Sequence, residues 1–549
     1  MGPSMEPLSL ETQHLINNKN PPPKPQEEDP TDQTSPPTNY LSNTKSILLE
    51  PLQWLQMLSS NLNPTFILGI FVVYGLSQGF SGSFFRVVTD YYWKDVQKLQ
   101  PSTVQIYMGF YYIPWVMKPL WGLLTDVFPV AGYRRRPYFV AAGVLGSASA
   151  LAVALVGELP VAAALTCLVG VTAGMAIADV TIDACIAKSS IEIKGLAADM
   201  QSLCGFCSSV GALIGFSTSG LFVHRLGPQL ALVLLAMPPA LVAVLGFVIY
   251  EVKRSPGGQN DEKGNTSIKY FHNQVVEDLG VAVKGTWRTI QCPQVWKPSL
   301  YMYLSLALSI STHEGQFYWY THPNPNPNPN PGPPGPAFSQ SFIGMVYAVG
   351  ALASIVGVVI YQKALKDIPF RTLLFSAQLL YALSGMLDVV FILRWNLWLG
   401  IPDSLFVMAE ECVSRVVSRV RWTPMIVLST RLCPSGIEGT FFALLMCIDS
   451  LGSLSSKWGG GLMLHWFGVT RTEFGNLWAV VLLRNGLRLG TLGLVFLVPN
   501  RGLGDELVPD GVLGVVSDGC RELGDGDGGV LLVGMEGGDK GERTTLLQS

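Results

Sequence analysis

The sequence predicts an all-α membrane protein with twelve transmembrane helices in two pseudo-symmetric halves of six. The first observation is composition: of the 549 residues, 49% are hydrophobic and only 14% are charged, whereas soluble proteins carry about 25% charged residues. The second is that apolar segments long enough to cross a bilayer recur along the chain. The third is that short motifs of the early segments return in the later ones.

The twelve apolar segments are justified in chain order by their hydropathy. The predicted spans are 66–86, 104–124, 138–157, 160–179, 196–222, 229–250, 298–318, 338–361, 371–393, 404–430, 439–466 and 475–498. Pro114, Pro119, Pro424 and the glycines at 459–461 interrupt some of them. Such breaks suit helices that line a cavity, where freed backbone groups can be satisfied.

The spans divide the chain into five regions. A polar, Pro-rich tail, 1–64, is predicted to be disordered and cytosolic, and is followed by the first six-helix half, 65–250. A linker, 251–295, leads to the second half, 296–498, which contains a Pro-Asn-rich loop at 323–336, and a Gly-rich tail, 499–549, follows. Lys and Arg favour the even-to-odd loops about three to one, so both termini are predicted to be cytosolic.

Two motifs recur at an offset of six spans. Residues 220–227 (GLFVHRLG) end span five, and residues 461–468 (GLMLHWFG) end span eleven. Residues 109–112 (GFYY) in span two match 344–347 (GMVY) in span eight. A constant offset favours two parallel halves. Small residues in spans five and eleven permit close helix approach, which serves either a rocking interface or static packing.

Several costly polar groups lie within or at the ends of the spans. Asp179 and Asp183 are four residues apart and so share one helix face. They are candidates for substrate or proton binding, although Lys188 or Lys194 could simply neutralise them. Asp449 is two helical turns from Lys457, so the two could also share a face, and they mark the predicted centre of a cavity.

The loop between spans two and three carries a second charged motif. Residues 122–136 read GLLTDVFPVAGYRRR. This resembles the signature loop of the major facilitator superfamily, in which an acidic residue and a basic cluster latch the cytosolic helix ends. The resemblance implies a cytosolic gate formed by Asp126, Arg134, Arg135 and Arg136. The alternative is a loop whose arginines only set the membrane orientation.

A closer resemblance covers about residues 66–498. Its motifs are 179–184 (DVTIDA), 198–203 (ADMQSL), Arg421-Trp422-x-Pro424, 432–446 (LCPSGIEGTFFALLM) and 469–472 (VTRT). These resemble the folate–biopterin transporter family, in particular its plant and cyanobacterial branch. The Pro-Asn-rich loop and the Gly-rich tail depart from the family pattern.

The resemblance implies transport of folates or pterins with a co-transported cation, preferably a proton. Carboxylates can accept hydrogen bonds from a pterin ring, and Arg or Lys can bind the carboxylates of folate. The candidate residues for substrate binding or proton coupling are Asp179, Asp183, Asp199, Gln201, Arg431, Glu438, Asp449 and Lys457. Further cations are available at Lys118, Arg415, Arg419, Arg421, Arg484 and Arg488.

Other functions are weighed against this one. A carrier for another organic anion would share the same architecture, and a non-transporting membrane receptor or scaffold would use the tails and the linker. The sequence carries no P-loop and no nucleophile–base–metal pattern, so neither a primary pump nor an enzyme is expected. No cofactor, metal or nucleic-acid partner is expected. The host membrane is left open among plasma membrane, tonoplast and plastid envelope.

Overall fold

The computed structural model describes eight stretches of the chain in addition to residue 54. They are 56–128, 130–157, 159–192, 197–251, 291–322, 335–365, 368–431 and 438–498, the first two being separated by residue 129 alone. The chain separates into two units, Met1–Asn61 and Leu62–Ser549. Everything below concerns the second unit. The Gly-rich tail and most of the N-terminal tail, of the linker and of the Pro-Asn-rich loop predicted from the sequence lie outside the described residues.

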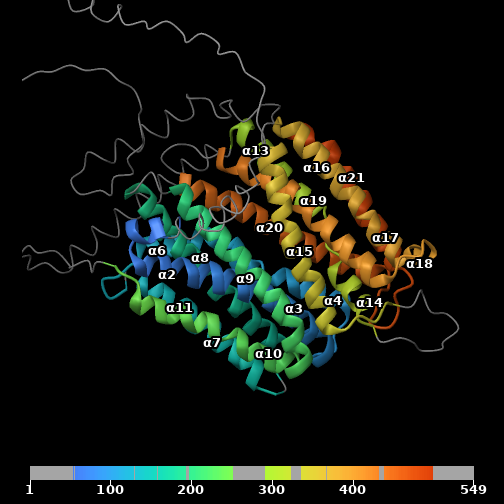
Figure 1. Ribbon diagram of the computed structural model, residues 1–549, viewed down its shortest axis with the longest axis horizontal. Coiled ribbons are helices and arrows are strands. Elements are labelled where there is room, and N and C mark those ends of the chain that lie inside the picture. The colour runs from blue at the N-terminus through green and yellow to red at the C-terminus, as the bar shows by residue number, and fades with distance from the viewer. Residues whose placement is uncertain are drawn as a thin grey trace, which may run out of the picture. The chain divides into compact units, whose positions relative to one another are not determined.

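The first predicted half consists of helices, which Figure 1 colours from blue to green. They are α2 (Pro64–Ile70), η1 (Phe71–Ser81), α3 (Gly82–Tyr91), η2 (Tyr92–Val96), α4 (Pro101–Phe110), α5 (Ile113–Val116), α6 (Lys118–Val127), α7 (Arg136–Leu155), α8 (Val161–Glu192), α9 (Ala197–Leu226), α10 (Pro228–Leu235) and α11 (Met237–Val248). Elements α2 to η2 follow one another without a gap and form the first span. Within it, η1 has π-helical hydrogen bonding.

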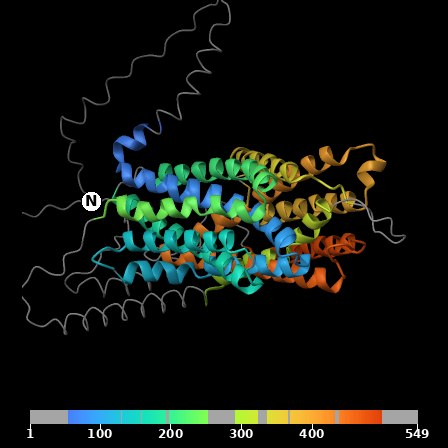
Figure 2. The same ribbon diagram turned by 90° about the horizontal axis from the view of Figure 1, so that it is seen from below.

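The second predicted half is also helical and runs from green-yellow to red in Figure 1. Its elements are α13 (Pro293–Ala307), α14 (His313–Tyr320), α15 (Gln340–Ile360), η4 (Tyr361–Leu365), α16 (Phe370–Ser384), α17 (Met386–Ile392), α18 (Trp395–Trp398), α19 (Asp403–Arg431), α20 (Glu438–Trp466), α21 (Leu477–Gly490) and η5 (Thr491–Leu497). The long helices of both halves run roughly parallel to one another (Figure 2).

Eight helical segments of the described residues are long and apolar enough to cross a membrane. They correspond to predicted spans one, three to six, eight, nine and twelve. Spans two and seven are broken into shorter helices at Tyr111–Tyr112 and at residues 308–312. Span ten carries five charged residues and span eleven carries two. Helices lie at these four positions too, but their crossing of the membrane stays a prediction.

Helix α8 is longer than the sequence suggested. The prediction ended the fourth span at residue 179, yet α8 continues to Glu192. Asp179 and Asp183 therefore lie inside a continuous helix and do not terminate it. No Pro or Gly follows Asp179 before residue 192, so nothing in the local sequence stops the helix there.

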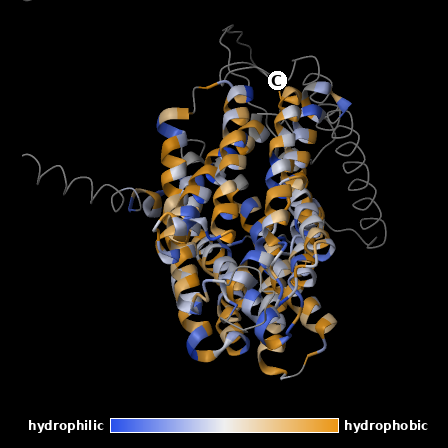
Figure 3. Ribbon diagram, turned by 90° about the vertical axis from the view of Figure 1, so that its right-hand side faces the viewer, coloured by the Kyte–Doolittle hydropathy of each residue, from blue (hydrophilic) through white to orange (hydrophobic). Residues whose placement is uncertain are grey.

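Apolar side chains dominate both the packing core and the outer faces of the helices. The core contains fully buried aromatic side chains such as Trp93, Trp319 and Phe391. Large apolar side chains, among them Phe247 and Phe496, are exposed on the outside, as expected where lipid replaces water. Figure 3 shows the apolar ribbon colour along the helices, with hydrophilic segments at their ends and within the bundle.

Close contacts between helices occur where glycines lie. A Cβ atom added at Gly211 of α9 would overlap the carbonyl oxygen of Gly75 in η1. A Cβ added at Gly461 of α20 would come 2.7 Å from the carbonyl oxygen of Ser102 in α4. Gly220 of α9 lies equally close to the start of α15. The two recurring Gly-Leu motifs, which begin at Gly220 and Gly461, therefore both begin at a contact between helices. The small residues have a packing role, and the rocking movement stays a prediction.

We expect Gly211→Val to prevent accumulation of folded protein. The overlapping atoms belong to the backbone of η1, so no side chain can move aside, and overpacking of this kind costs roughly 1–3 kcal/mol or more. Gly205→Val on the same helix is the matched control, since no atom lies within 4 Å of its added Cβ. Size-exclusion chromatography of detergent extracts measures the result. Equal yields of monodisperse protein for both variants would contradict it.

Candidate functional site

The first group of buried charges lies where η1, α6 and α8 meet, and we call it the Asp179 cluster. It consists of Tyr74, Lys118, Asp179 and Asp183. Lys118 forms an ion pair with Asp179, and the Tyr74 hydroxyl donates a hydrogen bond to Oδ1 of Asp183. The spacing of four residues in the sequence therefore does bring both aspartates to one site, as predicted.

The position of Lys118 is set by the start of α6 and by the neighbouring Trp115 ring. Pro119 follows Lys118 at the start of α6, where a proline is well tolerated. The Lys118 ammonium lies 4.9 Å from the ring centroid of Trp115, a cation–π geometry. The alternative pairing of the aspartates with Lys188 or Lys194 cannot be compared, because those two side chains lie outside the described residues.

Asp449 and Lys457, which the sequence analysis placed together, belong to different surroundings. Asp449 of α20 interacts electrostatically with Arg421 and Lys118, next to the Asp179 cluster. Lys457 interacts instead with Arg86, Asp90 and Glu314. Eight residues along a helix correspond to about 12 Å of rise and to a rotation of about 80° beyond two full turns. The expectation of one shared central site is therefore not met by the geometry.

The second group, which we call the Glu314 cluster, consists of Arg86, Asp90, His313, Glu314 and Lys457. The side chains of Asp90 and Glu314 have no solvent exposure. Nε2 of His313 lies 3.0 Å from Oδ2 of Asp90 and 4.0 Å from Oε1 of Glu314. The cluster joins α3 and α20 to α14, which lies beside α4 in Figure 1.

Sequence reasoning missed most of the Glu314 cluster. Glu314 lies inside predicted span seven and Asp90 lies four residues beyond the end of predicted span one. The rule that selected Asp449, a carboxylate in an apolar segment, applies equally to Glu314. Asp90 would have been included if the first span had been extended to Val96, where the helical path ends.

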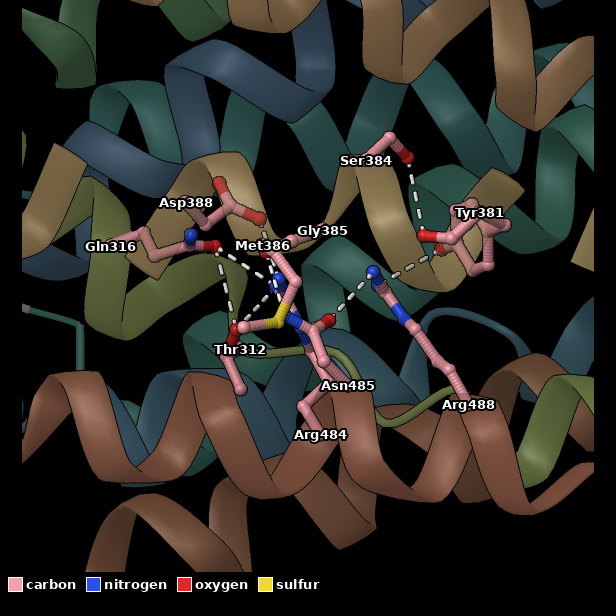
Figure 4. A network of polar contacts seen from close by, with 10 residues as sticks. All are labelled: Thr312, Gln316, Tyr381, Ser384, Gly385, Met386, Asp388, Arg484, Asn485 and Arg488. Atoms are coloured by element: carbon pink, nitrogen blue, oxygen red, sulfur yellow. Dashed lines mark hydrogen bonds and ion pairs between the residues drawn. The ribbon is translucent and has the colours of Figure 1, made fainter. Parts of the chain in front are cut away.

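A third group of charges centres on α21, and Figure 4 shows its contacts around Arg484 and Arg488. Nη2 of Arg484 lies 2.5 Å from Oδ2 of Asp388, and its Nη1 donates to Oγ1 of Thr312 at 2.9 Å. Arg488 donates to the Tyr381 hydroxyl at 3.0 Å. The guanidinium groups of Arg488 and Arg421 lie 4.1 and 4.4 Å from the centroid of the Tyr381 ring.

The arginines of the predicted cytosolic gate form hydrogen bonds with Glu251, the first residue of the predicted linker, and with Thr125 of α6. The backbone amides of Arg134, Arg135 and Arg136 donate to the carboxylate of Glu251, at 2.7 to 3.1 Å. Nη1 of Arg135 donates to Oγ1 of Thr125 at 2.9 Å. The side chain of Asp126 lies outside the described residues, so its role in the latch stays a prediction.

The four remaining candidates are Asp199, Gln201, Arg431 and Glu438, and the structure places none of them in the clusters described above. Gln201 is exposed near the start of α9, and Asp199 is half-buried two residues before it. Arg431 ends α19 and Glu438 begins α20, but their side chains lie outside the described residues. Their assignment to the substrate or proton site stays a prediction.

A pocket of about 740 Å³ lies at the helix ends opposite to those predicted to face the cytosol. Lys94, His224, His322 and Arg471 are among its lining residues. Nζ of Lys94 donates to the carbonyl oxygen of Thr321 at 2.9 Å, and Nη2 of Arg471 donates to the carbonyl oxygen of Lys94 at 3.0 Å. Partial burial lowers the pKa of His322, and the nearby Lys94 lowers it further. Hydrogen bonds thus join the two predicted halves at this end.

Comparison with known proteins identifies a family and a fold. Residues 78–511 match the model of the BT1 family. The Arabidopsis thaliana protein "Probable folate-biopterin transporter 6" is 60% identical over 468 residues, which are 85% of this chain and 89% of that one. The "Folate-biopterin transporter" of Synechocystis sp. is 29% identical over 81% of this chain and 82% of its own length. The expected resemblance to these transporters is confirmed.

The similarity to solved structures concerns the fold. The crystal structure of a POT family transporter in complex with a thioalcohol-conjugated peptide superposes with a TM-score of 0.56 at 13% identity. The match covers 78% of this chain and 94% of that transporter. The all-helical fold of this chain is accordingly similar to the fold of that transporter.

Proposed function

Since this chain belongs to the BT1 family, we propose that it carries folates or pterins across a membrane by alternating access, driven by a proton gradient. Its multi-pass helical fold and the transporters to which it is similar support this proposal. The observation that carries it is the Asp179 cluster, in which two carboxylates and a cation lie together within the helix bundle.

The Asp179 cluster has the chemistry that a pterin requires. A pterin ring presents an amino group and a ring N–H side by side, and one carboxylate can accept both hydrogen bonds. Asp183 has such a carboxylate, and its neighbour Asp179 is neutralised by Lys118. Arg421, next to Asp449, is a suitable partner for a carboxylate of folate. A carrier for another organic anion would use the cations but would have less need of the two aspartates.

The two predicted halves meet through α9 with α15 and through α4 with α20. The hydrogen bonds of Lys94 and Arg471 close one end of this contact. Alternating access would require these bonds to break when the other end closes. The arginines of the predicted gate, at the opposite end, are suited to take part in that closure.

Uptake of labelled folic acid and labelled pterin into proteoliposomes tests the proposal. We expect uptake of at least one of them, faster with acid outside than at equal pH. Asp183→Asn is expected to lower the uptake about tenfold to a hundredfold, because a hydrogen bond to a charged group contributes roughly 1.5–3 kcal/mol.

Asp403→Asn is the control, since this carboxylate pairs with Arg394 within the second half, 3.0 Å away. Absence of uptake of both compounds by the unaltered protein would refute the proposed function. If Asp179→Asn, Asp183→Asn and Asp449→Asn all kept normal proton-driven uptake, the function could stand but the site assignment would be wrong.

A further inference from the structure

The Glu314 cluster places two buried carboxyl groups from different predicted halves next to each other. Asp90 belongs to α3 and Glu314 to α14. One ligand atom each from Asp90, His313 and Glu314 lies within 4.8 Å of the others. Residues 90 and 314 are far apart in the sequence, so only the contact between the halves brings these groups together.

Three carboxyl oxygens of this pair have no hydrogen-bond donor among the described residues. They are Oδ1 of Asp90 and both side-chain oxygens of Glu314, and all three are buried. Gln105 does not supply a donor, because its Oε1 accepts the backbone N–H of Glu314 and its Nε2 is itself without a partner. A buried, unsatisfied carboxylate is costly, and two of them side by side repel each other. One proton bound to the pair leaves a single negative charge, which removes the repulsion, and it supplies one hydrogen-bond donor between the two carboxyl groups.

Titratable and charged groups face the pair from every element packed against it. They are Arg86 and Tyr91 on α3, Tyr111 after α4, His313 and Tyr318 on α14, Tyr347 on α15 and Lys457 on α20. Arg86 and Lys457 place positive charge beside the pair. A divalent metal ion would bring two positive charges next to these two cations, whereas a proton brings one, so the surroundings favour a single proton.

We infer that Asp90 and Glu314 form the proton-binding site that couples the proton gradient to the movement of the two halves. This inference rests on the proposed function, and it names the coupling residues that the sequence analysis sought among Asp179, Asp183 and Asp449. The proton binds to a carboxylate oxygen to give one carboxylic acid, and it leaves again as the same proton.

The position of the pair explains how a proton would drive the movement. Asp90 and Glu314 lie on opposite sides of the contact between the halves, on the side of the hydrogen bonds made by Lys94 and Arg471. With a proton bound, the carboxyls can stay together and this end remains closed. Once the proton is released toward the cytosol, the two negative charges repel each other and favour reopening of this end.

Glu314→Gln distinguishes proton coupling from substrate binding. The glutamine side chain is neutral, as a protonated glutamate is, but it can neither bind nor release a proton during the transport cycle. Proteoliposomes would be loaded with unlabelled substrate to measure exchange at equal pH, and separately given a gradient of one pH unit to measure accumulation. For one proton per electroneutral cycle, this gradient supports at most about tenfold accumulation. We expect the unaltered protein to do both. The Gln variant is expected to retain exchange but to accumulate no substrate above the external concentration.

If Glu314→Gln does not reach the membrane, Asp90→Asn can be tested in the same way. Asp403→Asn is the matched control, and we expect it to accumulate substrate normally. Accumulation by both Glu314→Gln and Asp90→Asn at the level of the unaltered protein would overturn the inference. So would accumulation that requires sodium or a divalent metal in place of a pH gradient. Failure of the proposed function is a different result, in which the unaltered protein shows neither exchange nor accumulation.

Discussion

Lys118→Met is expected to abolish substrate uptake and to lower the free energy of unfolding by about 3–5 kcal/mol. Lys118 is the ion-pair partner of Asp179, and the two side chains are only 19% and 7% exposed. Removing the Lys118 ammonium leaves the neighbouring carboxylates of Asp179 and Asp183 without the cation that pairs with Asp179. An uncompensated buried charge of this kind destabilises the folded protein. Uptake into proteoliposomes and thermal unfolding in detergent measure the two effects.

A double variant distinguishes loss of folding from loss of function at this site. Lys118→Met with Asp179→Asn removes both members of the ion pair, and replacing a complete buried pair is often nearly neutral for stability. We expect it to unfold at nearly the temperature of the unaltered protein while remaining inactive. Lys297→Met, at an exposed position, is the control for loss of a lysine. Normal uptake by the double variant would remove the Asp179 cluster from the transport site.

Gly220→Val is expected to block transport while leaving each half folded. A Cβ atom at Gly220 would overlap the carbonyl oxygen of Gln340 and would come 3.1 Å from Cα of Ser341, both on or at the start of α15. Gly344 lies in the same contact, since a Cβ added there would be 3.0 Å from the amide nitrogen of Gly220. At roughly 1–3 kcal/mol, this overlap would lower the population of the closed conformer about 5- to 150-fold.

Uptake rate and thiol labelling measure this effect. In the Gly220→Val background, a cysteine introduced by Ser341→Cys should react faster with a membrane-impermeant reagent, because the contact between α9 and α15 is opened. Gly205→Val lies on the same helix in open space and should change neither quantity. Unchanged uptake by Gly220→Val would mean that the closed contact seen here is not part of the transport cycle.

The sequence by itself determined the properties that depend on local composition. Long apolar segments predict helices that cross a membrane, and eight of the twelve expected spans meet this requirement in the described residues. The spacing of Asp179 and Asp183 places both on one helix face, and the structure confirms that they share a site. The recurrence of the Gly-Leu motif located two helix contacts, because only glycine permits such close approach of backbones.

Only the tertiary structure decided which charges meet. Asp449 and Lys457 are on one helix, but because of rotation and rise Asp449 lies next to the Asp179 cluster and Lys457 belongs to the Glu314 cluster. Lys118 was one of several available cations, and the packing of α6 against α8 selected it as the partner of Asp179. Asp90 and Glu314 are separated by more than two hundred residues. No helical periodicity acts over that distance, so their meeting depends on how the two halves pack.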